Sequence, residues 1–222
     1  MITQEFCRFL AELENNNRKE WFDEQRKRYE THVKKPFAAL VADMLPHMTT
    51  LDPLIDMQPK DAIFRINRDI RFSADKSPYN PSMKAAFVRG GRKSPNAGYF
   101  LGISADAIHL GGGAYNPDKD GIEAIRRRIA AGPREFGRMC RDANFTELFG
   151  EVKGEAVKRV PAELRDAFAL EPLVANKQWY VMRAEPIAPL LKAGTLETRI
   201  AELTAAAAPL ISYLNDAMAA GS

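Results

Sequence analysis

The chain contains 222 residues, of which 45% are hydrophobic and 27% are charged. These values are typical of a folded globular protein and exclude the disordered and fibrous classes. The formal net charge is only +3. This near balance of charges argues against a nucleic-acid-binding protein, which usually carries a large positive charge. Because no low-complexity linker interrupts the chain, we expect a single compact domain over residues 1–222.

Three features bear on the compartment of the protein. Charged residues are scattered through the first twenty positions, which argues against a secretory signal. The longest apolar run covers residues 205–211, far short of the roughly 18 residues that cross a bilayer. Cys7 and Cys140 lie far apart and outside any CxxC spacing, so neither a zinc site nor a disulfide framework is expected. We therefore expect a cytoplasmic protein with no membrane contact, and we predict no metal and no cofactor.

Residues 1–50 are predicted to be helical. Apolar residues recur at helical spacing from Phe6 to Leu13, which predicts a first amphipathic helix. Asn17 and Glu20 have the spacing of a capping box, so a second helix is expected from Asn17 to about Lys35. Pro36 is expected to kink that helix or to begin a third one.

Residues 60–113 change to short extended runs, which we interpret as strands at residues 62–66, 84–89, 97–103 and 107–110. Their short connections favour antiparallel pairing. The turn at residues 104–106 predicts that the last two strands form a hairpin. Gly111, Gly112 and Gly113 follow the last strand, and we expect them to provide backbone that can approach an anion closely.

Residues 116–218 are predicted to be mainly helical, with a late strand near residues 178–183. Asn116 and Pro117 have the pattern of an N-cap and a first helical position, and Gly132 is expected to end that helix. Pro209 is expected to kink or to end the last helix. The predicted fold class is therefore α+β, with an antiparallel sheet in the middle of the chain covered by N-terminal and C-terminal helices.

Residues 65–79 concentrate charged and hydrogen-bonding side chains, which makes the segment too polar for a core strand. Two carboxylates face four basic groups in this segment: Asp69 and Asp75 against Arg65, Arg68, Arg71 and Lys76. One-to-one ion pairs therefore leave at least two cations without a local partner. Because a guanidinium group binds phosphate or carboxylate bidentately, the segment is a candidate anion site.

The leading interpretation is a pocket for a small anionic ligand, with or without enzymatic activity, in which these cations share one cleft floored by the three glycines. The predicted ligand-binding residues are Arg65, Arg68, Arg71, Lys76, Tyr79, Gly111, Gly112, Gly113 and Arg126. In an enzyme, Asp69 or Asp75 could act as a base, and Lys76 or Tyr79 could donate a proton.

Two alternatives remain open from the residues alone. The first is a nucleic-acid-binding or protein-interaction module, because residues 65–93 carry a net charge of +6 and residues 126–141 a net charge of +5. The second is a structural role for the motif, in which Asp69 and Asp75 accept hydrogen bonds from the arginines and hold a long loop onto the sheet. The sequence predicts no oligomeric state.

The segment from Arg68 to Tyr79 matches the pattern R-D-x-R-F-S-x-D-K-x-P-Y throughout. In this it resembles a bacterial and fungal family known as domain of unknown function 2461. Residues 15–22, Tyr99 and the glycines before Tyr115 extend the resemblance over most of the chain, whereas Asn80 stands where the family leads us to expect a lysine or arginine. The resemblance implies a cytoplasmic, single-domain protein and implies no reaction or substrate.

Overall fold

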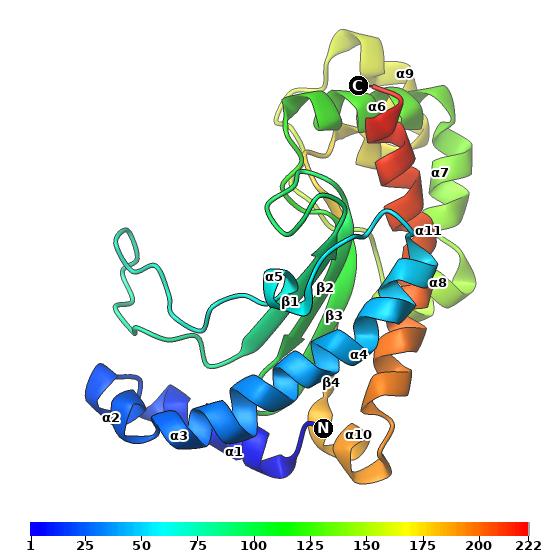
Figure 1. The fold of residues 1–222 in the computed structure, drawn as a ribbon. Helices are drawn as coiled ribbons and strands as arrows, with labels where there is room; N and C mark the ends of the chain where they lie inside the picture. Colours follow the sequence, from blue (N-terminus) through cyan, green and yellow to red (C-terminus); the bar gives the residue numbers. More distant parts are fainter. Residues whose placement is uncertain (222) are drawn as a thin grey trace.

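The N-terminal helices form an arm that runs along one side of the molecule (Figure 1). The computed structural model describes residues 1–221. The helices of the arm are α1 (Gln4–Asn15), α2 (Lys19–Glu24), α3 (Arg26–Tyr29), the π-helical turn η1 (Glu30–Lys34), α4 (Lys35–Leu51) and α5 (Pro59–Ala62). Pro36 lies in the first turn of α4, which continues directly from η1 with helical backbone, so Pro36 does not interrupt the helical path. The expected capping box is wrong, because Arg18 precedes α2 and no side chain caps that helix.

Four strands form an antiparallel sheet in the order β1-β2-β3-β4. The strands are β1 (Met83–Val88), β2 (Gly98–Ile103), β3 (Ala107–Ala114) and β4 (Trp179–Pro186). Leu101 pairs with Leu110 across the predicted hairpin, and β4 is the predicted late strand. With helices before and after the sheet, the α+β class and the central antiparallel sheet are confirmed.

The structure corrects two of the predicted strand boundaries. Residues 62–66 form no strand, because Ala62 ends α5 and Ile63 makes only an isolated bridge with Ala85. The three glycines lie inside β3 rather than after it. A Cβ at Gly111 would stand 2.0 Å from the carbonyl oxygen of Val181 on β4, so glycine is required there because the neighbouring strand comes too close for a side chain.

The C-terminal half is helical around β4. Its elements are α6 (Lys119–Ala131), α7 (Pro133–Cys140), α8 (Ala143–Phe149), η2 (Ala162–Leu164), α9 (Arg165–Leu170), η3 (Pro172–Ala175), α10 (Ile187–Ala193) and α11 (Leu196–Ala219). Gly132 ends α6 as predicted. Asp118, not Asn116, caps that helix by accepting a hydrogen bond from Gly121 N–H. Pro209 lies inside α11 and does not end it.

The two faces of the sheet have different neighbours. On one face, Phe87, Leu101 and Leu110 are buried, where α11 packs on β2 and β3 and α4 packs on β1. Buried side chains there belong to one core cluster that extends from Ile2 to Met218. The strand pairing places Lys84, Phe100 and His109 on the opposite face, and all three are partly exposed. No helix within residues 1–221 is long and apolar enough to cross a membrane.

Candidate anion-binding pocket

Residues 63–82 form a long loop that projects from the body of the molecule, away from α11 (Figure 1). The base of the loop is closed by backbone hydrogen bonds from Arg68 N to Pro78 O, 2.9 Å, and from Asn80 N to Ile66 O, 2.8 Å. The side chain of Asn17 bonds both backbone groups of Tyr79 at 2.9 and 3.0 Å. The motif loop is therefore tied to itself and to the connection between α1 and α2.

The charges of the motif are largely paired within the loop. Arg68 forms an ion pair with Asp75, and Arg71 bonds Asp69 through two hydrogen bonds of 2.9 and 2.7 Å. Lys76 Nζ donates to the carbonyl oxygen of Ile70 at 3.0 Å. Such contacts are expected if the motif has a structural role, in which its carboxylates accept hydrogen bonds from the arginines.

The surroundings of Asp69, Asp75 and Tyr79 do not favour the acid–base roles predicted for them. Hydrogen bonds from Arg71 lower the pKa of Asp69, and those from Arg68 and Ser77 hold the pKa of Asp75 well below its usual range. A carboxylate with a lowered pKa is a weak general base near neutral pH. Tyr79 is buried and stacks on Phe22 with ring centroids 4.0 Å apart, so its ring belongs to the contact between the loop and the arm.

The expected cleft, in which the motif cations would converge on the glycines, is not formed. Gly111, Gly112 and Gly113 are buried inside the sheet. Arg126 lies on α6 and donates to the carbonyl oxygens of Ala175 and Asn176 at 2.9 to 3.2 Å. That guanidinium group therefore holds η3 and the segment before β4 against α6.

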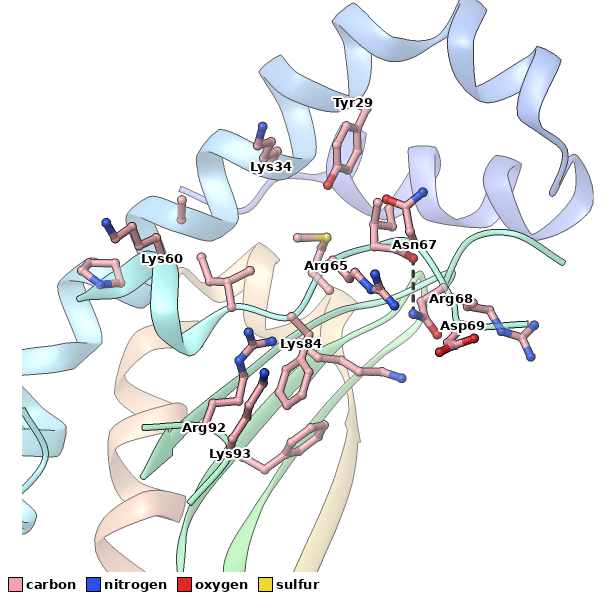
Figure 2. A pocket seen from close by; sticks show the side chains of 18 of the residues that line it. Tyr29, Lys34, Lys60, Arg65, Asn67, Arg68, Asp69, Lys84, Arg92 and Lys93 are labelled. Atoms are coloured by element: carbon pink, nitrogen blue, oxygen red, sulfur yellow. Dashed lines mark hydrogen bonds between the residues drawn. The ribbon is translucent and has the colours of Figure 1, made fainter. Parts of the chain in front are cut away.

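A large pocket lies instead between the N-terminal arm, the base of the motif loop and β1 (Figure 2). Its volume is about 1440 Å³. Seven cationic residues and a single carboxylate, Asp69, line it. The cationic residues are Lys34, Lys60, Arg65, Arg68, Lys84, Arg92 and Lys93. Figure 2 shows these residues on the helices, the loop and the sheet that surround the pocket.

Six of these seven cations form no ion pair with any residue in the described range 1–221; the exception is Arg68, which pairs with Asp75. Asp69, the one carboxylate in the lining, is itself bonded to Arg71. Among the described residues, Arg65 and Lys76 are thus the two motif cations without an ion-pair partner that the charge count predicted, and Arg65 is the one that lines the pocket. Asp69 also interacts electrostatically with Arg65, but one carboxylate against seven cations leaves the lining with a net positive charge.

Neutral groups complete the lining. Figure 2 shows the hydroxyl of Tyr29 directed into the pocket. Burial raises the pKa of Tyr29 to about 12, so this hydroxyl stays protonated and can donate a hydrogen bond. The guanidinium group of Arg92 lies over the ring of Phe64, 4.8 Å from its centroid, which orients a cation without neutralising it.

The sequence predicted part of this lining. Arg65 and Arg68 were named as ligand-binding residues, and Lys84, Arg92 and Lys93 belong to the segment with the net charge of +6. Lys34, Lys60 and Tyr29 were missed. They come from helices of the arm, and no spacing in the sequence relates them to the motif. Arg71, Lys76 and Tyr79 do not line the pocket, although any role of theirs in ligand binding stays a prediction.

The chain matches the family model described as conserved hypothetical protein, domain of unknown function 2461, over residues 5–213. The chain belongs to this family. No curated protein and no solved structure showed a match to it. Every residue that lines the pocket falls within the matched part, so the pocket is built from the family's domain. Within residues 1–221 no group of three or more His, Cys, Asp or Glu side chains is placed to hold a metal ion.

Proposed function

We propose that this protein binds a small ligand carrying two or more phosphate groups in the pocket between the arm, the motif loop and β1. The observation that carries the proposal is the set of six cations without ion pairs around one cavity: Lys34, Lys60, Arg65, Lys84, Arg92 and Lys93. A multiply charged anion would neutralise several of them at once. A ligand with a single carboxylate group would leave most of these cations repelling one another.

The chemistry of the lining fits phosphate groups. The planar guanidinium groups of Arg65 and Arg92 can each donate to two phosphate oxygens, whereas the ammonium groups of the lysines act as point charges. The protonated hydroxyl of Tyr29 adds a donor that does not depend on charge. The lining resembles the donor sets with which proteins bind phosphates, in which arginine and lysine act together.

Calorimetric titration with pyrophosphate tests the proposal. Arg65→Gln removes an unpaired pocket cation and should weaken binding by about 1.5–3 kcal/mol, the range of a charged hydrogen bond. Arg165→Gln is the matched control, because Arg165 is exposed on α9 and does not line the pocket. Undetectable binding by the unmodified protein, or equal loss in both variants, would refute the proposal.

Nucleic acid is the alternative partner, and one observation favours it: Phe72 is 96% exposed on the projecting loop, next to Arg71. Against it, the arginines of residues 126–141 are partly used inside the fold, since Arg126 bonds backbone carbonyl groups and Arg141 pairs with Glu171. If duplex DNA binds, a plot of the logarithm of the affinity against the logarithm of the salt concentration should have a slope of about −0.9 for each phosphate neutralised. Absence of DNA binding at low salt would remove this alternative.

The compartment proposed for this activity is the cytoplasm. Cys7 and Cys140 are both free cysteines, which suits a reducing environment. Phosphorylated metabolites are abundant there, and a binding pocket of this charge would find its ligand in the same compartment.

A further inference from the structure

A second pocket adjoins the first on the open face of the sheet. It has a volume of about 620 Å³ and shares Lys84 and Phe100 with the basic pocket. Residues that are distant in sequence form its walls: the end of α1 with Glu14, the segment before β1, the β2–β3 turn and β4 with Met182. Lys84 and Phe100 therefore lie at the junction of two neighbouring pockets.

The two pockets differ in charge. The basic pocket has seven cations and one carboxylate, whereas Lys84, His109, Glu14 and Asp106 are the titratable residues of the second pocket. Neither Glu14 nor Asp106 forms an ion pair within residues 1–221, and Asp106 accepts a hydrogen bond from Ser104 Oγ at 2.8 Å. An anionic group in the second pocket would meet the two carboxylates Glu14 and Asp106, so a ligand that fills both pockets must be anionic at one end only.

The floor of the second pocket suits a flat group. Gly102 has no side chain, and a Cβ at that position would lie 3.2 Å from Phe100 Cε1 and 3.5 Å from His109 Cβ. The ring of Phe100 therefore leans over Gly102, with Met182 nearby in the lining. Aromatic rings bind planar groups by stacking, and thioethers make favourable contacts with ring edges.

We infer that the ligand is a nucleotide, with its phosphates in the basic pocket and its base in the second pocket. This inference rests on the proposed function. Lys84 and Phe100 are diagonal neighbours on adjacent strands, because Lys84 pairs with Gly102 and Ala86 pairs with Phe100. The Cα atoms of such neighbours are about 7–8 Å apart. A phosphate held by Lys84 and a base held by Phe100 would therefore lie on neighbouring parts of the same sheet face, as the two ends of one nucleotide do. Glu14 and Asp106 can accept hydrogen bonds from ribose hydroxyl and base amino groups.

Titrations of the full chain with four nucleoside diphosphates, pyrophosphate and ribose 5-phosphate test the inference. At least one nucleoside diphosphate should bind about tenfold more tightly than pyrophosphate and ribose 5-phosphate, as expected for one base stacked on an aromatic ring. If pyrophosphate binds and no nucleotide binds more tightly, the nucleotide inference is wrong and the proposed function stands. If none of these ligands binds, the proposed function fails as well.

Two variants at one position separate stacking from simple filling of space. Phe100→Leu keeps an apolar side chain but removes the aromatic face, so it should abolish the preference for the nucleotide over pyrophosphate. Phe100→Tyr keeps the ring and should retain that preference. Thermal unfolding of both variants checks that they fold. Equal nucleotide affinity in Phe100→Leu and the unmodified protein would overturn the inference.

Discussion

Asn17 determines where the motif loop sits. Its side-chain amide donates to Tyr79 O and accepts from Tyr79 N–H, at 2.9 and 3.0 Å. Tyr79 also stacks on Phe22 of α2. One residue of the N-terminal arm therefore satisfies both backbone groups of a buried residue in the loop, 62 positions away in the chain.

Asn17→Ala should destabilise the protein by about 1–3 kcal/mol, because it leaves the N–H and the carbonyl group of a buried residue without partners. Asn16→Ala is the control and should cost much less, since Asn16 bonds only Glu12 O within its own helix. Chemical denaturation measures both values. Hydrogen exchange in residues 67–79 should accelerate in Asn17→Ala alone, and equal behaviour of the two variants would contradict the role given to Asn17.

At the scale of elements, a cluster of charges ties β4 to two helices. Glu185 on β4 accepts from Arg199 of α11 at 2.6 and 2.9 Å. It also accepts from Arg183, whose guanidinium group donates to the carbonyl oxygens of Glu147 and Leu148 in α8. The hydrogen bonds from Arg199, followed by those from Arg183, lower the pKa of Glu185 to about 2.

A lowered pKa in the folded state stabilises the protein above the pKa of the unfolded chain, and that stabilisation is lost as pH falls. Glu185→Gln should therefore cost about 1–3 kcal/mol at pH 7. The cost should decline as the pH is lowered from about 4.5 towards 2. Denaturation of Glu185→Gln across pH gives the measurement. Glu202→Gln is the control and should change the stability little, because the Glu202 side chain is 56% exposed in its ion pair with Arg199. A cost for Glu185→Gln that does not depend on pH would contradict the stabilising role given to the Glu185 carboxylate.

The predicted elements were right where a periodic pattern decided the structure and wrong where a tertiary contact did. Hydrophobic spacing predicted α1 and the β2–β3 hairpin. Asn17 was read as a helix cap because the local pattern fits one, but its amide is used by Tyr79. The glycines of β3 were expected to follow the last strand and to approach an anion, but β4 lies too close for a Cβ at Gly111 and Gly113, and α11 and β2 lie too close at Gly112.

At the scale of the whole molecule, the pocket joins parts of the chain that the sequence does not relate. The count of charges in the motif correctly required cations without local partners, and Arg65 is one of them. It could not identify the partners of Arg68 and Arg71, because pairing depends on how the loop folds. Lys34 and Lys60 reach the same cavity from the arm, and only the tertiary fold brings them there.

Unpaired cations around one cavity should lower the stability of the ligand-free protein through mutual repulsion. Lys84→Gln should therefore raise the melting temperature by about 1–2 °C at low salt, and the gain should disappear at high salt, where charges are screened. Lys192→Gln, at an exposed residue of α10 outside the pocket, should cause no shift. A lower melting temperature for Lys84→Gln would show instead that Lys84 stabilises the fold.

Binding of phosphates in the basic pocket is tested most directly by a crystal structure of the protein grown with pyrophosphate at low salt. We expect both phosphate groups inside the cavity, with oxygens about 3 Å from the side-chain nitrogens of Arg65 and Lys84. Pyrophosphate bound only at the projecting loop beside Arg71, or at the arginines of α7, with the cavity free of it, would contradict the proposed function.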